Sequence, residues 1–372
     1  MRGIFPFIFV AVLGAFIQLL LALIFEQSAR RWYSRIKRRW WWLRSRFLPD
    51  RPTYSQSEFR IENWTVNCIV LEGTPKKPFA LGQITCDFNP TPTRLPSDLA
   101  KILERVYKRE RSIAEKRGLP QFYNGPMVSF VEFSRSRTPG FEDALLHLKF
   151  QLTDFYTFLA TTVNLYERVE SGDHYVTMRE KYLAGSDFTK PCPYIATSFG
   201  VNLAVVTKDD YLIIGRRGIH GISNYQDQWC VPVCECVNPN VDRDVNGNVD
   251  VYKTAKRGAH EELGIDVLES KIEFFSLCVD TAWYLYGLTG LIRADNLIKD
   301  DIIYRRTRGI KDKWETAVIE VVNFRPSPVA VAIRDTGGPR RWHPASFTAI
   351  VQSLVHEYGQ KSVESAFRSI RA

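Results

Sequence analysis

The pattern of apolar and charged positions sets the first 59 residues apart from the rest of the chain. Residues 3–25 are uncharged and mostly apolar, and they lie between Arg2 and Glu26. A helix rises about 1.5 Å per residue, so about 20 apolar residues cross the hydrocarbon layer of a membrane. The pattern predicts a transmembrane anchor within residues 1–26, followed by a juxtamembrane segment and linker over residues 27–59. A cleaved signal peptide is the alternative, but here the basic residues follow the apolar stretch and no small-residue cleavage site is evident.

The segment over residues 30–47 is basic and aromatic. Its sequence, RRWYSRIKRRWWWLRSRF, contains eight basic residues, four tryptophans and no acidic residue. Basic residues beside a membrane span stay on the cytosolic side, so we expect the N-terminus outside and residues 27–372 in the cytosol. Tryptophan rings suit the membrane interface and the basic side chains suit anionic lipid headgroups, although single-stranded nucleic acid is an alternative partner. Gly14 and Ala15 in the apolar stretch would also permit association into a homo-oligomer.

Charge and cysteine usage narrow the function of the remaining chain. Residues 1–51 hold ten Lys or Arg and two acidic residues, a net charge of +8, so only +1 of the formal net charge of +9 falls on the rest. No general nucleic-acid binding is therefore expected of the soluble part. The seven cysteines are scattered and odd in number, which indicates a reducing compartment rather than a disulfide framework.

Residues 60–195 are predicted to form a smaller α+β domain. Residues 95–118 have apolar positions at three- and four-residue spacing, with Ser97 as the expected N-cap and Gly118 as the C-cap. Two strand-like runs and a second, shorter helical pattern follow; they cover residues 127–133, 145–155 and 156–169.

Residues 196–372 are predicted to form an α/β/α sandwich around a mixed sheet. The order of elements is a strand pair, an extended run, a turn-rich loop, a helix, further strands and a closing helix. These occupy residues 198–218, 228–237, 237–251, 251–265, 271–294, 314–324 and 344–359. Such an order places helices on both faces of one sheet.

The helix over residues 251–265 carries the candidate chemistry. Arg257 and Glu261 are four residues apart and therefore neighbours on one helix face, and Glu262 lies one position round. Two adjacent carboxylates favour a neutralising cation, and Mg²⁺ or Mn²⁺ takes such oxygen ligands while keeping room for water and phosphates. Arg257 would orient Glu261 through a charge-assisted hydrogen bond. The alternative is an ordinary solvated helix end.

Residues 197–345 resemble a Nudix hydrolase domain, whose box reads G-x5-E-x7-R-E-U-x-E-E-x-G-U, with U bulky and apolar. The segment LIIGRR (212–217) resembles the second strand of the family, and QWCVPVCEC (228–236) resembles the segment that leads into the box. The second half of the box matches at Arg257, Ala259, Glu261, Glu262, Gly264 and Ile265. The resemblance implies pyrophosphate hydrolysis with a divalent cation.

Both halves of the box depart from the family pattern in places. In the second half Gly258 stands where the motif has a glutamate, and in the first half Val249 and Arg243 stand where its first Glu and Gly would fall. One possible ligand is therefore missing from the helix. Glu235, in the extended run before the loop, is the candidate for a displaced carboxylate ligand. Asp242 and Asp244 in the loop are weaker candidates, because loop aspartates are commonly turn formers.

The resemblance assigns expected roles to the remaining site residues. Glu261, Glu262 and Glu235 would bind the metal ion. Glu315 would act as the base or orient the attacking water. Arg216, Arg217 and Trp229 would bind the substrate, with Trp229 stacking on a base unless it is buried in the core. Cys230, Cys234 and Cys236 are not spaced as a zinc site.

A looser resemblance extends into the front region. Asn124-Gly125 and the stretch Thr153–Phe158 are similar to the N-terminal region of Nudix proteins that hydrolyse UDP-glucose and related nucleotide sugars. Two hypotheses follow. The first is a membrane-anchored, cytosol-facing Nudix hydrolase that acts on a nucleoside diphosphate derivative, with a nucleotide sugar favoured. The second is a catalytically weak Nudix-like domain that binds a nucleotide signal as a membrane-linked sensor.

Overall fold

The computed structural model describes most of the chain beyond residue 57. The described residues are 58–137, 144–171, 174–185, 187–218, 225–307 and 316–370. The predicted membrane anchor, the basic segment and Glu315 lie outside these ranges. Within them, no helix combines the length and the apolar composition that crossing a membrane requires.

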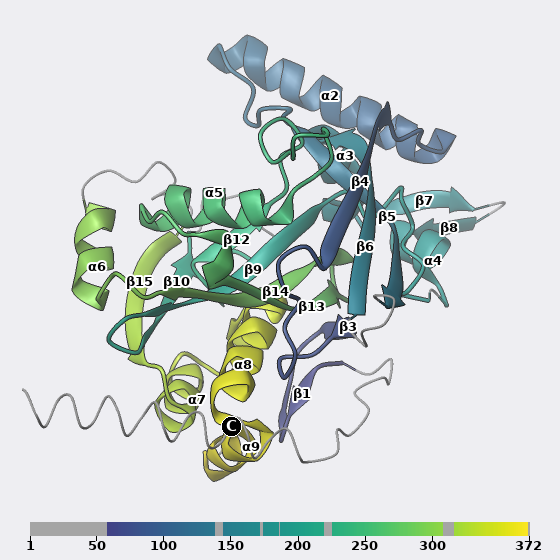
Figure 1. The fold of residues 1–372 in the computed structure, drawn as a ribbon. Helices are drawn as coiled ribbons and strands as arrows, with labels where there is room; N and C mark the ends of the chain where they lie inside the picture. Colours follow the sequence, from purple (N-terminus) through teal and green to yellow (C-terminus); the bar gives the residue numbers. More distant parts are fainter. Residues whose placement is uncertain are drawn as a thin grey trace, which may run out of the picture.

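A mixed eight-stranded sheet forms the centre of the protein (Figure 1). The strand order is β11-β10-β9-β14-β13-β3, with β12 also pairing with β9 and β15 with β10. Only the pairing of β9 with β14 is parallel among the pairings of this sheet within the described residues. The strands are β3 (Cys68–Gly73), β9 (Phe199–Thr207), β10 (Tyr211–Arg217), β11 (Trp229–Cys230), β12 (Val233–Cys236), β13 (Ile272–Asp280), β14 (Leu285–Ala294) and β15 (Thr316–Asn323).

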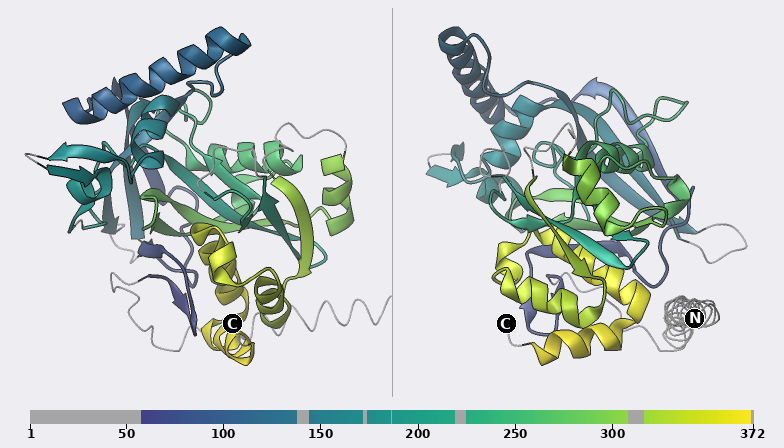
Figure 2. Two further views of the ribbon diagram at one scale, coloured as in Figure 1. Left: turned by 180° about the vertical axis from the view of Figure 1, so that it is seen from behind. Right: turned by 90° about the vertical axis from the view of Figure 1, so that its left-hand side faces the viewer.

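Helices cover both faces of this sheet, as the sequence predicts (Figure 2). Along β9, Val201 and Leu203 belong to the core cluster that includes α5, whereas Ala204 and Val206 belong to the cluster that includes α8. Because successive strand residues point to opposite faces, β9 is buried on both sides. The helices on the α8 side are α7 (Pro326–Asp335), α8 (Pro344–Tyr358) and α9 (Gln360–Ser369), and those on the other side are α5 (Val251–Leu263) and α6 (Lys299–Thr307).

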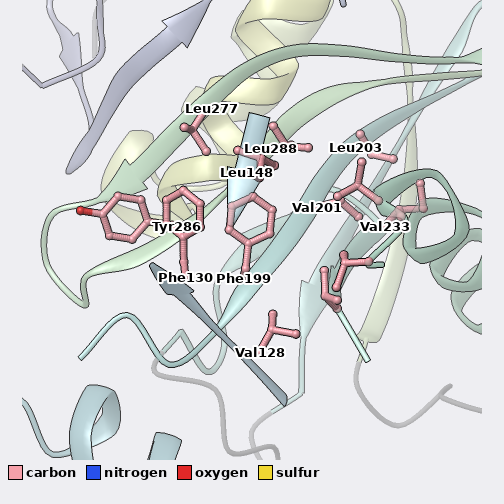
Figure 3. Packing of buried hydrophobic residues seen from close by; sticks show 14 of the residues in the cluster. Val128, Phe130, Leu148, Phe199, Val201, Leu203, Val233, Leu277, Tyr286 and Leu288 are labelled. Carbon is pink, nitrogen blue, oxygen red and sulfur yellow. The ribbon is translucent and has the colours of Figure 1, made fainter. Parts of the chain in front are cut away.

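The front region builds a second sheet that packs against the first. Its order is β4-β6-β5, and α2 lies along its end (Figure 1). Phe130 of this sheet contacts Phe199 of β9 and Tyr286 of β14, with ring centroids 5.0 and 5.1 Å apart (Figure 3). The elements are β4 (Ile84–Pro92), α2 (Ser97–Arg117), β5 (Pro126–Arg137), β6 (Ala144–Asp154), α3 (Phe155–Phe158), a π-helical turn (Leu159–Val163), β7 (Arg168–Ser171), β8 (His174–Thr177) and α4 (Met178–Leu183).

The two predicted domains share backbone and side-chain contacts. Strand β3 comes from residues 60–195 but pairs with β13 of residues 196–372. A short hairpin of β1 (Arg60–Ile61) and β2 (Trp64–Thr65) precedes it, and Trp64 packs edge-on against Phe367 of α9. The domain boundary at residue 195 therefore stays a prediction, and these contacts join residues on its two sides.

Several predicted elements are confirmed and two details are wrong. The long front helix ends at the left-handed Gly118, but Pro96 and not Ser97 occupies its N-cap position. The helix expected over residues 156–169 is shorter than predicted: the helical turns end at Val163, and β7 begins at Arg168. The strand pair of β9 and β10 and the turn-rich loop before α5 agree with the sequence pattern.

Candidate functional site

Local sequence signals fix both ends of α5. Asp250 is the N-cap, and its carboxylate accepts hydrogen bonds from the backbone N–H groups of Tyr252 and Lys253 at 2.9 and 3.2 Å. Gly264 ends the helix in the left-handed conformation at φ 66°, where a residue with a Cβ is strained. Ala255 and Ala259 are fully buried against the sheet. This anchoring turns the face with Arg257 and Glu261 away from the core.

Arg257 is the centre of a group of carboxylates from three different elements. Its Nη1 lies 2.9 Å from Glu235 Oε1 of β12 and 2.9 Å from Glu261 Oε2 of its own helix. Its Nε and Nη2 donate to the two oxygens of Asp242 at 2.9 and 2.8 Å. We call these four residues the Arg257 cluster. One guanidinium faces three carboxylates there, so the cluster has an excess of negative charge when all are ionised.

Asp242 holds the guanidinium from a buried position in the loop before α5. It is 1% exposed, and its Oδ2 also accepts from Thr254 Oγ1 at 3.0 Å and from the backbone N–H of Asn238 at 2.9 Å. Burial disfavours the charge on Arg257, but the hydrogen bonds to Asp242 and the negative charge of Glu235 outweigh it and raise the pKa of Arg257 above its ordinary value. Asp244 instead accepts from two backbone N–H groups of the loop, as expected of a turn former.

Glu235 reaches the cluster because α5 has a glycine beside it. A Cβ on Gly258 would lie 2.9 Å from Glu235 Cβ and 3.1 Å from Val233 Cγ1. Glycine inside a helix costs about 1 kcal/mol relative to alanine. The close approach of β12 explains why glycine occupies position 258. The same approach brings Glu235, the predicted displaced ligand, next to the face of α5 that carries Arg257 and Glu261.

Glu262 has different surroundings from its neighbour Glu261. It is 4% exposed, and its Oε2 accepts from Thr316 Oγ1 at 3.3 Å. Arg306 of α6 donates to the backbone oxygens of both Glu262 (3.2 Å) and Thr316. Burial lowers the pKa of Arg306, and the charge of Glu262 acts in the opposite direction. We call these three residues the Arg306 cluster.

The predicted metal ligands are thus only partly brought together. Glu235 and Glu261 meet at one guanidinium nitrogen, with side chains 20% and 16% exposed, whereas Glu262 is engaged by the Arg306 cluster. Across the described ranges, no group of three or more His, Cys, Asp or Glu side chains is arranged to hold a metal ion. Mg²⁺ is commonly held by one or two carboxylates together with water and substrate phosphates. Two partly exposed carboxylates fit that smaller ligand set.

None of the predicted substrate-binding residues is one of the four residues of the Arg257 cluster. Trp229 is 8% exposed and stacks on Trp342, with ring centroids 6.1 Å apart, in the core cluster of the α8 side. Arg216 pairs with Asp227 at 2.5 Å, and Arg217 donates to Cys234 Sγ at 3.4 Å. Of the three, Arg217 has a contact next to the cluster, because its partner Cys234 precedes Glu235 on β12.

The three cysteines of residues 230–236 are free thiols that belong to different surroundings. Cys234 lies 3.2 Å from Asn202 Oδ1, and Cys236 lies 3.4 Å from Ser198 Oγ. Burial raises the pKa of the Cys234 thiol to about 12, whereas Cys236 is exposed. A thiol that stays protonated, as that of Cys234 does, is a poor nucleophile and a poor metal ligand at neutral pH.

Comparisons with known proteins add little beyond this geometry. Neither a protein-family model nor a curated protein matches the chain. The structure of DR0079 from Deinococcus radiodurans is similar at 15% identity and a TM-score of 0.26, over 37% of this chain and 74% of that one. A MutT protein from Methanosarcina mazei Go1 is similar at 15% identity and a TM-score of 0.24, over 34% of this chain and 77% of that one. At these values neither similarity supports an inference about activity.

Proposed function

We propose that residues 196–372 hydrolyse a phosphoanhydride bond in a nucleoside diphosphate derivative, with Mg²⁺ or Mn²⁺ as cofactor. The observation that carries the proposal is the meeting of Glu235 and Glu261 at Arg257 Nη1. This contact brings together Arg257 and Glu261 of the motif and Glu235 of β12, which is expected to replace the glutamate missing from the helix. The sequence resemblance of the front region favours a nucleotide sugar as substrate.

In this proposal Glu235 and Glu261 would hold the cation, and Arg257 would orient both carboxylates. A bound divalent cation neutralises the charge that develops on phosphate oxygens as water attacks. Asp242 would act indirectly: it accepts two hydrogen bonds from the Arg257 guanidinium and so fixes its plane. Glu315 remains the proposed base on the strength of the resemblance alone.

Binding without hydrolysis is the second candidate, and one observation favours it. The position between Glu235 and Glu261 is already filled by the positive charge of Arg257, and Gly258 contributes no carboxylate. A domain of this kind would recognise a nucleotide and pass the signal on to the rest of the chain.

A substrate panel distinguishes the two functions. Full-length protein in detergent micelles is incubated with nucleotide sugars and dinucleotides, each with Mg²⁺ or Mn²⁺, and release of nucleoside monophosphate is followed by chromatography. Hydrolysis predicts a product that is lost in Glu261→Gln and kept in Glu115→Gln, a matched change on the exposed face of α2. Tight nucleotide binding without product under either metal would instead support the sensor.

We also propose that residues 3–25 anchor the chain in a membrane, with the soluble part in the cytosol. The uncharged stretch and the basic, tryptophan-rich segment after it support this proposal. Cell fractionation tests it: the full chain should pellet with membranes and be released by detergent, and a chain without residues 1–48 should remain in the supernatant. A full chain already found in the supernatant contradicts the anchor.

A further inference from the structure

Strand β12 is held between two glycines at the position of Glu235. On one side, a Cβ at Gly258 of α5 would lie 2.9 Å from Glu235 Cβ and 3.2 Å from its Cγ. On the other side, a Cβ at Gly200 of β9 would lie 2.7 Å from the backbone oxygen of Glu235. Cβ contacts below 3.0 Å are essentially never found. Two separate elements therefore leave room for this one residue.

The side chain of Glu235 begins in the space that a side chain at position 258 would enter. From there its carboxylate reaches Arg257 Nη1, 2.9 Å away, which is the nitrogen that also contacts Glu261. The register of β12 on β9, with Glu235 opposite Val201, fixes this direction. Val233, two residues earlier on the same strand face, is fully buried and lies 3.1 Å from the same hypothetical Cβ.

We infer that positions 235 and 258 are an exchanged pair. The carboxylate that a Nudix box carries on the helix, directly after its arginine, is supplied in this chain from β12 by Glu235, and Gly258 is the residue that admits it. The helix and the strand thus share one side-chain space, which holds a single glutamate. The steric part stands on geometry alone, and its consequence for turnover rests on the proposed function.

The exchange makes a specific prediction about moving the glutamate back. Gly258→Glu alone places two side chains in one space. Such overpacking is destabilising, and we expect the melting temperature to fall by about 5 °C or more. Glu235→Gly alone empties the space and removes the carboxylate from Arg257. The double variant Glu235→Gly/Gly258→Glu again has one glutamate in the space, so it should melt well above Gly258→Glu.

The four proteins are compared as full-length chains in detergent micelles, by thermal melting and by turnover of the substrate found in the panel. Glu320→Gly, at an exposed position of β15, measures the general cost of glycine in a strand. We expect Glu235→Gly to lose about 100-fold in turnover, as loss of a residue that supports a metal site does, and the double variant to regain at least about tenfold of that loss.

If the changes in melting temperature of the two single variants simply add in the double variant, the inference that positions 235 and 258 share one space is overturned. A Glu235→Gly variant with unchanged turnover, or a folded double variant with no recovery, would overturn the exchanged carboxylate. If the unsubstituted protein turns over no substrate, the proposed hydrolysis fails. The melting comparison then still decides whether the two positions share one space.

Discussion

The two adjacent glutamates near the end of α5 belong to regions with opposite characters. Glu261 lies in the Arg257 cluster, where a strand, a loop and a helix each present a carboxylate to one partly exposed guanidinium. Glu262 lies in the Arg306 cluster, where its carboxylate is buried and accepts a hydrogen bond from Thr316. The sequence motif treats the two as a pair. In the structure Glu261 belongs to a partly exposed acidic group, which we propose as the cation site, and Glu262 belongs to a buried group that joins α5, α6 and β15.

Loss of Arg257 should have the largest effect on stability. Arg257→Ala leaves Asp242 buried without its cation and sets Glu235 and Glu261 against each other, so the free energy of unfolding should fall by about 3–5 kcal/mol. Urea denaturation followed by tryptophan fluorescence measures it. The matched control is Arg334→Ala, which removes an exposed arginine–aspartate pair and should cost at most about 1 kcal/mol. Equal effects of the two changes would mean that the Arg257 cluster carries no special stability.

Asp280 sharpens the comparison, because it is as buried as Asp242 but is held by neutral donors. It accepts hydrogen bonds from the Tyr225 hydroxyl and from the backbone N–H groups of Ala282 and Trp283. Burial raises its pKa from 3.8 to about 6.

The folded protein therefore retains the Asp280 proton between about pH 4 and 6, where the unfolded chain has lost it. The contribution of Asp280 to the free energy of unfolding is complete below pH 4 and falls as pH rises to 6. The total loss is about 3 kcal/mol, and the contribution does not change above pH 6. Asp280→Asn should remove this component from the pH profile of unfolding. An unchanged profile would show that the carboxyl does not titrate in this window.

Removal of Arg306 should cost less than removal of Arg257. Arg306→Ala leaves the buried backbone oxygens of Glu262 and Thr316 without their donor, and we expect a loss of about 2 kcal/mol in urea denaturation. Arg305→Ala is the neighbouring control, since its hydrogen bond to the Gly264 oxygen is exposed. A loss no larger than that of the control would remove the structural role assigned to the Arg306 cluster.

The smallest change isolates the hydrogen bond that sets Glu262 apart. Thr316→Val keeps the side-chain shape and removes the donor to Glu262 Oε2, so stability should fall by about 1 kcal/mol. Turnover or nucleotide binding should remain at the level of the unsubstituted protein. A large loss of activity with unchanged stability would move Glu262 from the structural region into the site.

Local signals predicted α5 and its motif well. The helical spacing of residues 251–265 and the motif match at Gly264 involve residues close together in the chain, so the sequence contains them directly, whereas the N-cap Asp250 was identified only in the structure. The hairpin of β9 and β10 is likewise a contact between neighbours in the chain. Glu235 could be suggested because the missing helix glutamate left a specific gap to fill.

Contacts between distant residues account for what could not be predicted. Asp242 precedes Arg257 by fifteen positions, across an enlarged loop, and fixed motif spacing did not identify it as the partner. Trp229 lies in a two-residue strand, too short for alternation to show which face it occupies, and it packs on Trp342 far along the chain. The pairing of β3 with β13 joins segments about 200 residues apart, and no local pattern marks it.

Binding of Mn²⁺ to the full-length protein, measured by electron paramagnetic resonance, tests the division between the two glutamates most directly. The unsubstituted protein should bind Mn²⁺, and Glu261→Gln should weaken its affinity at least about tenfold, as loss of one group of a metal site does. Glu262→Gln should leave the affinity within about twofold, because that carboxylate belongs to the Arg306 cluster. Equal losses in both variants, or no Mn²⁺ binding by the unsubstituted protein, would contradict the assignment of the Arg257 cluster as the cation site.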